Sequence, residues 1–499
     1  MKNQQKQERE TLERGLKSRH LSMIAIGGTI GTGLFLAMGG TIADAGPGGA
    51  LVAYIIMGIV VYFMMTALGE MATKLPIPGA FTAYADRFID PAWGFMNGWC
   101  YWFGCSMTVA AELVAGAIII KYWFPGSNST LWAILFMAIL LAFNLFSVKG
   151  FGEAEYWFAG IKVVVTIIFL IVGVLMILGI MKGDEAGFSN WVLDGGDDGK
   201  APFPNGVSGI ILVFLVAAFS FSNTEVVGLT AAESENPRKD VPKAIKSVFW
   251  RILLFYLGTI VIIATIIPFT EPSLLDAAED NIAASPFTMV FKNAGFAAAA
   301  SVMNAVILTS VLSCGNSTMY SASRTLQVMA KKGTAPKFFA KLSRTGVPVR
   351  AVVATAVVGA TAFIASLVGD GIAYTAAYYL CGIAGVINWL TISLAHYRFR
   401  KGWLKQGHEL SELDYKAPLY PFGTLFAIAI CILVTLTCNY WLFSDFNWFD
   451  FITCYGMIPL GFLLFFGYKK KHGTKWVKYE DMDFDPPEGV DKHDISAIA

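Results

Sequence analysis

The sequence predicts an all-α polytopic membrane protein with twelve transmembrane helices. Three observations support this fold class: the composition, the long apolar stretches, and the alternating charge of the segments between them. Of 499 residues, 56% are hydrophobic, 14% are aromatic and only 15% are charged, whereas soluble domains are roughly 25% charged. The formal net charge is +1 and no basic run is interleaved with aromatic residues. We therefore expect a lipid bilayer as partner and no nucleic acid.

The apolar stretches give the number of spans. About 20 apolar residues cross roughly 30 Å of hydrocarbon. Twelve such stretches occur, at about 22–41, 48–69, 92–120, 131–147, 156–181, 206–231, 248–269, 296–326, 351–368, 373–395, 421–438 and 448–467. We expect an N-terminal tail over 1–20, a single transmembrane domain over 21–467 and a C-terminal tail over 468–499.

The charge of the connecting segments orients these spans. Lysine and arginine gather in the N-terminal tail, after the sixth, eighth and tenth stretches, and after the twelfth. The segments after the fifth, seventh and eleventh stretches carry aspartate and glutamate instead. Because cytoplasmic loops are the basic ones, we expect a multi-pass membrane protein with both tails in the cytoplasm.

The first stretch contains a glycine-rich interruption, "GGTIGTGLF", residues 27–35. Its glycines are Gly27, Gly28, Gly31 and Gly33. Glycine in a helix interior costs roughly 0.5–1 kcal/mol relative to alanine, so the backbone here is not expected to be helical. A GxxxG packing face explains the glycines but not the two threonines between them. A phosphate-binding loop is rejected because its terminal Lys-Ser/Thr is missing.

One other stretch, the sixth, is interrupted in a comparable way by "FSFSNTEVVG", residues 219–228. The first and sixth stretches hold the same place in two successive sets of five. Matching breaks of this kind indicate a five-plus-five inverted repeat with a substrate held between the broken helices. Repeat one then covers about 21–181 and repeat two about 206–395, and two extra helices follow over about 421–467.

Charged residues within the spans are functional candidates, because burying a charge in hydrocarbon costs several kcal/mol. Three stand out: Glu112, Lys162 and Glu225. Glu225 either carries a proton or caps the freed N–H groups of its own broken helix. Lys162 either pins the fold or couples transport, because a fixed ammonium can replace a bound sodium ion. Glu112 either joins this coupling or pairs with a neighbouring polar group.

Histidine and cysteine usage excludes several other chemistries. The seven cysteines lie in apolar surroundings without a CxxC pair, so we interpret them as packing residues. The five histidines lie in loops, tails or span ends, which argues against a buried histidine proton relay. No metal cluster and no nucleophile–base set is recognisable, so we expect neither an enzyme nor a cofactor.

Several segments are similar to the amino acid permease branch of the amino acid/polyamine/organocation superfamily. They are "GGTIGTGLF", "AGPGGALVAY", "FGEAEYWFAGIKV" and "FSFSNTEVVGLTAAESENPRKDVPKAI". "VFWRILLFY", "IIPFTEPSLL" and "AHYRFRKGWLKQGHEL" resemble the bacterial lysine-specific permeases within that branch. The resemblance covers about residues 15–480. It implies the five-plus-five repeat, with the eleventh and twelfth spans outside it.

The resemblance also implies a substrate site. In that family the unwound part of the first span binds the substrate carboxylate, a role that falls here to Thr32 and Gly33. Carbonyl groups of the two breaks bind the α-ammonium, and the matching positions are Thr29, Phe219 and Ser222. The ring of Phe219 matches an aromatic gate over the substrate.

Further positions match by the same resemblance. Tyr101 matches a side-chain pocket position in the third span, and Cys105 stands where a bulkier aromatic residue is expected. Lys162 matches a lysine associated with sodium-independent, proton-coupled transport. Asn223 replaces the glycine usual before Thr-Glu, and either stiffens the break or adds an amide ligand. Glu225 is the first candidate to recognise a cationic side chain.

The expected function is proton-coupled uptake of L-lysine by alternating access. Within the same class, uptake or exchange of arginine or histidine remains open. A non-transporting amino acid sensor is the alternative from another class, although the short tails leave little room for a signalling domain.

Overall fold

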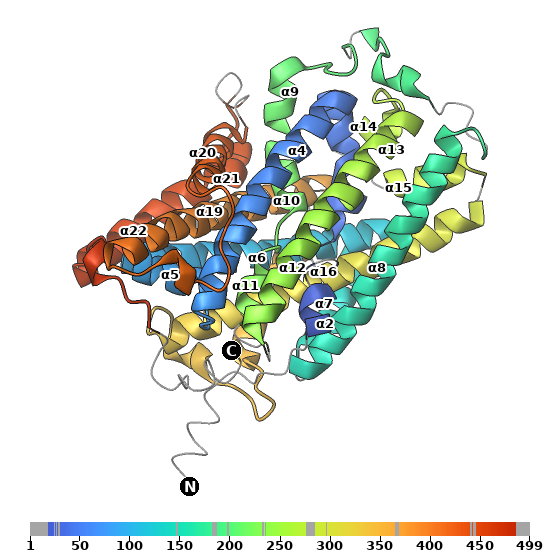
Figure 1. Cartoon of the computed structure of the whole chain (residues 1–499). Coiled ribbons are helices and arrows are strands. Elements are labelled where there is room, and N and C mark those ends of the chain that lie inside the picture. Colours follow the sequence, from blue (N-terminus) through green and yellow to red (C-terminus); the bar gives the residue numbers. More distant parts are fainter. Residues whose placement is uncertain are drawn as a thin grey trace.

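The structure is a computed structural model that describes residues 18–23, 25, 27, 30–145, 148–181, 187–196, 199–231, 234, 236–275, 285–295, 297–364, 369–439, 442 and 446–485. Over these residues the chain is helical and contains no strand beyond an isolated bridge between Asp194 and Lys200. The helices form one bundle around a continuous apolar core (Figure 1).

The helices of the first half correspond to the first five predicted stretches. They are α2 (Ser18–Met23), α3 (Thr32–Phe35), α4 (Ala37–Lys74), α5 (Ala80–Phe88), α6 (Pro91–Ile120), α7 (Ser129–Leu145) and α8 (Val148–Ile177), followed by the short η2 (Phe188–Trp191). The first predicted stretch is divided among α2, α3 and the beginning of α4. Ala25 and Gly27 still have π-helical backbone, whereas Ile30 and Gly31 lie outside any helix, so the described part of the predicted interruption lies directly before Thr32.

The second half follows the remaining seven stretches. Its helices are α9 (Gly206–Leu212), α10 (Phe214–Ser220), α11 (Val226–Ala231), α12 (Pro237–Arg251), η4 (Ile252–Leu257), α13 (Gly258–Ile266), α14 (Pro272–Leu275), α15 (Pro286–Asn293), α16 (Ala297–Lys331), η6 (Lys337–Ala340), α17 (Val349–Gly359), η7 (Ala360–Ile364), α19 (Asp370–Lys405), η8 (Leu410–Glu412), α20 (Phe422–Thr437), α21 (Trp448–Tyr455), α22 (Met457–His472) and η10 (Tyr479–Asp481). The sixth predicted stretch is divided among α9, α10 and α11.

Among the described residues, six helices are individually long and apolar enough to cross a membrane. A seventh span results if α21 and α22, which are bent by 53°, count as one. These helices are those of a multi-pass membrane protein. Several other predicted stretches are shorter or interrupted, so the number of twelve spans and the inverted repeat stay predictions.

The boundary between the first two predicted stretches is a kink without a loop. Gly46 has a φ of 71°, and Pro47 follows it inside α4. This left-handed backbone suits glycine, and proline is well placed to begin the helix that follows. A side chain at Gly46 would also meet Pro204 Cδ at 2.2 Å. The chain therefore reverses direction here with almost no connecting residues.

Helix α6 lies at the centre of the bundle. It packs along both α16 and α19, and also touches α5, α7, α17 and α22. In Figure 1, α6 and α16 cross behind α4, α12 and α13, and α4 contacts both α12 and α13. A residue on α6 can therefore face both the broken helices and α19.

At one end of the bundle a buried charge cluster joins α4 to α19. Glu70 accepts hydrogen bonds from Arg400 Nε at 2.8 Å and from the N–H of Ala417 at 2.6 Å. His396 Nε2 lies 3.3 Å from Glu70 Oε1. We expect the histidines in loops, tails or span ends, but in the structure His396 and His20 are both fully buried. His396 is buried because α19 continues to Lys405, ten residues beyond the predicted span end at 395.

The C-terminal segment 473–485 lies across the same end of the bundle. The N–H of Val477 donates to the carbonyl of Ile89 at 2.9 Å. Phe484 packs on Phe88 and Trp403, with ring centroids 5.6 and 5.1 Å apart. This segment therefore ties α5 to the end of α19.

Replacing Glu70 by alanine is expected to destabilise the protein by about 3–5 kcal/mol, because the buried Arg400 then lacks a counter-charge. Thermal unfolding of the detergent-solubilised protein measures this loss. The control is Glu480→Ala, which removes an ion pair between Glu480 and Lys405 whose side chains are each 55% exposed. The control should leave the melting temperature nearly unchanged, and equal effects of the two variants would contradict the prediction.

Candidate functional site

The first break runs between α2 and α3, and glycines bring its backbone close to other helices. A side chain at Gly31 would lie 2.6 Å from Glu112 Oε1, and one at Gly33 would lie 2.5 Å from Ser220 Cα. Gly27 packs in the same way on Ala159 of α8, so helix packing accounts for this glycine. The other predicted residues of this break, Gly28 and Thr29, lie outside the part of the chain that the structure describes.

Lys162 binds the backbone of the first break. Its ammonium donates to the carbonyl of Gly27 at 2.9 Å and to that of Ile30 at 2.8 Å. The side chain is 1% exposed. Helix interruption at membrane depth leaves carbonyl groups that need a partner, and here a cation held by α8 supplies it.

Glu112 lies on the other side of the same break. Its Oε1 accepts from the hydroxyl of Thr32 at 3.1 Å and lies 3.4 Å from the N–H of Thr32. The resemblance assigns Thr32, together with Gly33, to the substrate carboxylate. In this structure a carboxylate of the protein uses the two donors of Thr32, at the beginning of a helix.

The second break comprises residues 221–225, between α10 and α11. Asn223 adopts a φ of 64°, a left-handed conformation that asparagine tolerates better than most residues. Its side-chain amide donates to the hydroxyl of Thr318 on α16. The carbonyl of Phe219 accepts from the N–H of Ser222 at 3.0 Å. The amide of Asn223 therefore links this break to α16.

The seventh predicted stretch supplies two polar contacts to the second break. Arg251 donates to the carbonyl of Ala25 at 2.7 Å and to the hydroxyl of Thr224 at 2.5 Å. Tyr256 donates to the carbonyl of Ser220 at 2.7 Å. Between them lies the π-helix η4. Residues five apart diverge by about 140° on an α-helix but lie close to one face in a π-helix, so η4 aims both side chains at the break.

A small cavity of about 10 Å³ lies between the second break, α6 and α19. It brings together four predicted site residues: Tyr101, Ser222, Asn223 and Glu225. The remaining lining residues are Gly104, Cys105, Thr108, Cys381, Ala384 and Gly385. The volume suffices for about one water molecule, so the helices are drawn close together in this state.

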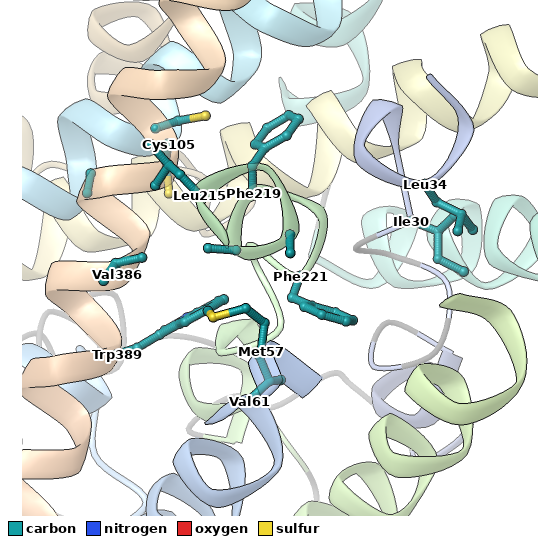
Figure 2. Close-up of a cluster of buried hydrophobic side chains, with 14 of the residues drawn as sticks. Ile30, Leu34, Met57, Val61, Cys105, Leu215, Phe219, Phe221, Val386 and Trp389 are labelled. Carbon is teal, nitrogen blue, oxygen red and sulfur yellow. The ribbon is translucent and has the colours of Figure 1, made fainter. Parts of the chain in front are cut away.

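Aromatic rings border this region (Figure 2). Phe219 lies on the side of Cys105, whereas Phe221 points away from it. The ring of Phe219 lies 5.7 Å from that of Tyr378 on α19. Glu225 accepts a hydrogen bond from the indole of Trp389 at 3.1 Å, also on α19. Helix α19 thus forms the wall opposite the second break.

The functional residues of α6 form one stripe. Tyr101, Cys105, Thr108 and Glu112 follow one another at spacings of four, three and four residues, which is one face of an α-helix. The stripe connects the cavity to the first break, because Glu112 is one turn, or about 6 Å, beyond Thr108. This spacing is visible in the sequence and groups Tyr101, Cys105 and Glu112, which the sequence singled out separately.

Several buried polar atoms around the two breaks have no hydrogen-bond partner among the described residues. They include the hydroxyls of Tyr101 and Tyr374 and the Oε2 of Glu112. Buried polar groups are normally satisfied. Unsatisfied atoms on α6 and α19 therefore make this region the candidate site for the polar groups of a ligand.

Sequence reasoning missed two parts of the site. Arg251 lies inside a predicted span but was not counted among its charges. Helix α19 contributes the cavity wall, and its small residues "CGIAG", 381–385, were the available signal. Small residues permit close helix approach, as at Gly104, where a side chain would meet Ala384 Cβ at 2.4 Å. The expectation of seven buried, unpaired cysteines is confirmed.

Known proteins are similar to this sequence over almost its whole length. The profile of the amino acid permease family matches residues 20–479. The lysine-specific permease LysP of Escherichia coli K12 is 48% identical over 95% of this chain and 96% of its own length. The lysine-specific permease LysP of Lactococcus lactis subsp. cremoris is 47% identical over 95% and 92%. The histidine permease HisP of the same organism is 44% identical over 95% and 98%.

Arg251→Lys is expected to lower both stability and transport. A single ammonium cannot reproduce the two guanidinium nitrogens that reach Ala25 and Thr224, and one lost charge-assisted hydrogen bond costs about 1.5–3 kcal/mol. Thermal unfolding and uptake into proteoliposomes measure the two effects. The control on the same helix is Arg238→Lys, whose partner Asp414 is at the surface. If Arg251→Lys lowers stability and uptake no more than this control does, the hydrogen bonds of Arg251 to the two breaks contribute to neither property.

Proposed function

Because the chain belongs to the amino acid permease family, whose members are transporters, we propose that it takes up L-lysine together with a proton across the bacterial inner membrane. Transport proceeds by alternating access, with both termini in the cytoplasm. The observation that carries the coupling to protons is the ammonium of Lys162 seated on the carbonyl groups of Gly27 and Ile30.

The position of Lys162 supports a proton rather than a sodium ion as the coupling ion. Carbonyl groups of an interrupted helix are the ligands that a sodium ion uses in transporters with broken helices. Here a lysine ammonium binds the two carbonyls itself. Releasing them during the transport cycle removes acceptors from a buried ammonium, which favours loss of its proton.

Glu112 supports a link between substrate binding and protonation. The carboxylate of a bound amino acid and that of Glu112 would compete for the hydroxyl and N–H of Thr32. Two ionised carboxylates cannot share one set of donors without strong repulsion. We therefore propose that Glu112 takes up a proton when the substrate carboxylate replaces it at Thr32 and Gly33.

Glu225 supports selection of a cationic side chain. The backbone of the breaks recognises groups that all amino acids share, so it cannot select lysine. The carboxylate of Glu225 lies in the cavity with Tyr101, Ser222 and Asn223, and is 2% exposed. A lysine ammonium would supply the counter-charge that a buried carboxylate needs.

The membrane potential adds to this driving force. Lysine and a proton together move two positive charges, each worth about 2.3 kcal/mol per 100 mV. Histidine is the second candidate substrate, because the 44% identical relative is a histidine permease. Three alternatives remain: arginine as substrate, obligatory exchange, and sensing without transport. The uptake and competition measurements below distinguish them from lysine uptake.

Lys162→Ala and Glu112→Gln are expected to abolish proton-driven accumulation of lysine. Each removes a group that holds a proton beside the first break. The measurement is uptake of labelled lysine into proteoliposomes with an imposed pH gradient, with the wild type as reference. Full proton-driven accumulation by Lys162→Ala would refute the coupling role, and uptake by the wild type that requires internal substrate would indicate exchange.

Glu225→Gln is expected to weaken lysine binding about 10- to 100-fold, because a charge-assisted hydrogen bond contributes about 1.5–3 kcal/mol. Competition of labelled lysine uptake by each amino acid measures selectivity. Wild-type uptake should be inhibited best by lysine, and the variant should lose this preference over neutral amino acids. Preference of the wild type for histidine or for a neutral amino acid would overturn the lysine assignment.

A further inference from the structure

A second carboxylate, Glu155, lies on the same helix as Lys162 and has no role in the site described above. It belongs to the segment "FGEAEYWFAGIKV", in which only Lys162 has so far been given a function. Its side chain is fully buried. Ionisable residues buried at membrane depth are costly, so their presence calls for a function.

Helix α8 faces lipid except along one buried stripe, whose residues include Glu155, Ala159, Lys162 and Thr166. Glu155 and Lys162 are seven residues apart, which places them on one face about 10 Å apart along the helix axis. Ala159 lies between them and packs against the backbone of Gly27. A Cβ atom added at Gly27 would lie 2.5 Å from Ala159 Cβ. The first break therefore covers the stripe between the two ionisable residues.

Polar side chains of α16 surround Glu155. The hydroxyl of Ser313 donates to Glu155 Oε1 at 2.7 Å. The side chains of Ser317 and Asn316 face the same carboxylate, and Glu155 Oε2, Asn316 Nδ2 and Ser317 Oγ have no other hydrogen-bond partner within the described part of the chain. The side-chain oxygen of Asn316 accepts a hydrogen bond from Asn144 of α7 at 2.8 Å. Hydroxyl and amide groups gathered at one buried carboxylate are suited to passing a proton through hydroxyl groups or water.

Glu155 also lies between Lys162 and the end of α8 that reaches the surface. Two residues before it, Glu153 is 37% exposed and pairs with Arg19. By the charge distribution of the sequence, this end faces the cytoplasm. A proton that leaves Lys162 toward the cytoplasm therefore meets Glu155 first.

We infer that Glu155 relays the coupling proton from Lys162 to the cytoplasm, an inference that rests on the proposed proton-coupled uptake. When the first break moves away from α8, the ammonium of Lys162 gives one proton to the Glu155 carboxylate, leaving a neutral amine and a neutral carboxylic acid. The acid then releases that proton to the cytoplasm. Lys162 regains a proton from the outside in the next cycle, so charge and protons balance.

Other ionisable groups on the surrounding helices have different positions. Glu112 on α6 and the Cys314 thiol on α16 lie at Gly31, on the substrate side of Lys162. His20 on α2 pairs with Glu153 at the surface end. Among the described carboxylates of α8, its neighbours and α6, Glu155 is the one that lies between Lys162 and the surface end of α8.

The test uses full-length protein in proteoliposomes with the membrane potential clamped and a pH gradient of about one unit, which can drive about tenfold accumulation. Glu155→Gln should reduce the accumulation ratio of lysine from about tenfold to about one, while exchange of labelled for unlabelled lysine continues. Glu155→Asp should recover part of the accumulation, because it retains an acid. Glu153→Gln is the matched control on the same helix and should keep both activities.

Accumulation by Glu155→Gln that follows the pH gradient as in the wild type would overturn the relay. Loss of exchange together with accumulation in both Glu155 variants would also overturn it, by indicating a structural role. If Glu155→Gln does not fold, Ser313→Ala replaces it. This variant should shift the pH profile of accumulation upward, because the ionised carboxylate loses a donor, and an unchanged profile would contradict the relay. Failure of the wild type itself to follow the gradient would refute the proposed function instead.

Discussion

The constraint on which this structure depends is that backbone groups freed inside a membrane need hydrogen-bond partners. Two helices are interrupted, and side chains from three others supply those partners: Lys162 from α8, Glu112 from α6, and Arg251 from α12. Each is an ionisable residue that would be costly in hydrocarbon by itself. The breaks and the buried charges therefore stabilise one another, and neither can be replaced by ordinary helix-packing residues without the other.

This mutual dependence gives the ionisable residues a functional consequence. A side chain that holds a backbone carbonyl by a hydrogen bond changes its environment whenever that carbonyl moves. Lys162 holds two carbonyls of the first break, and Arg251 holds a residue on each break. In the proposed transport cycle, movement of the broken helices would therefore alter the protonation equilibrium of Lys162 directly. The same contacts would then link a proton to the conformational change, and Glu155 would serve only to carry that proton away.

The sequence predicted the location of both breaks and of most helices, because apolar length and glycine content are local properties. It also singled out Tyr101, Ser222, Asn223 and Glu225, which the structure gathers around one cavity. It missed the role of α19, and it took His396 to lie at a span end, because these depend on which face of a long helix meets its neighbours. Arg251 was missed for a related reason: its partners, Ala25 and Thr224, are distant in sequence and become visible only when both breaks are seen together.

The arrangement divides recognition between two parts of one site. Thr32, Glu112 and Lys162 lie at the first break, where we propose that the carboxylate and the proton bind, whereas Glu225 and Tyr101 lie at the cavity. Helix α6 connects the parts, since one stripe of its side chains reaches both. In the proposed function, substitutions at its cavity end, such as at Cys105, would alter the substrate side chain that is accepted while leaving the donors at Thr32 unchanged.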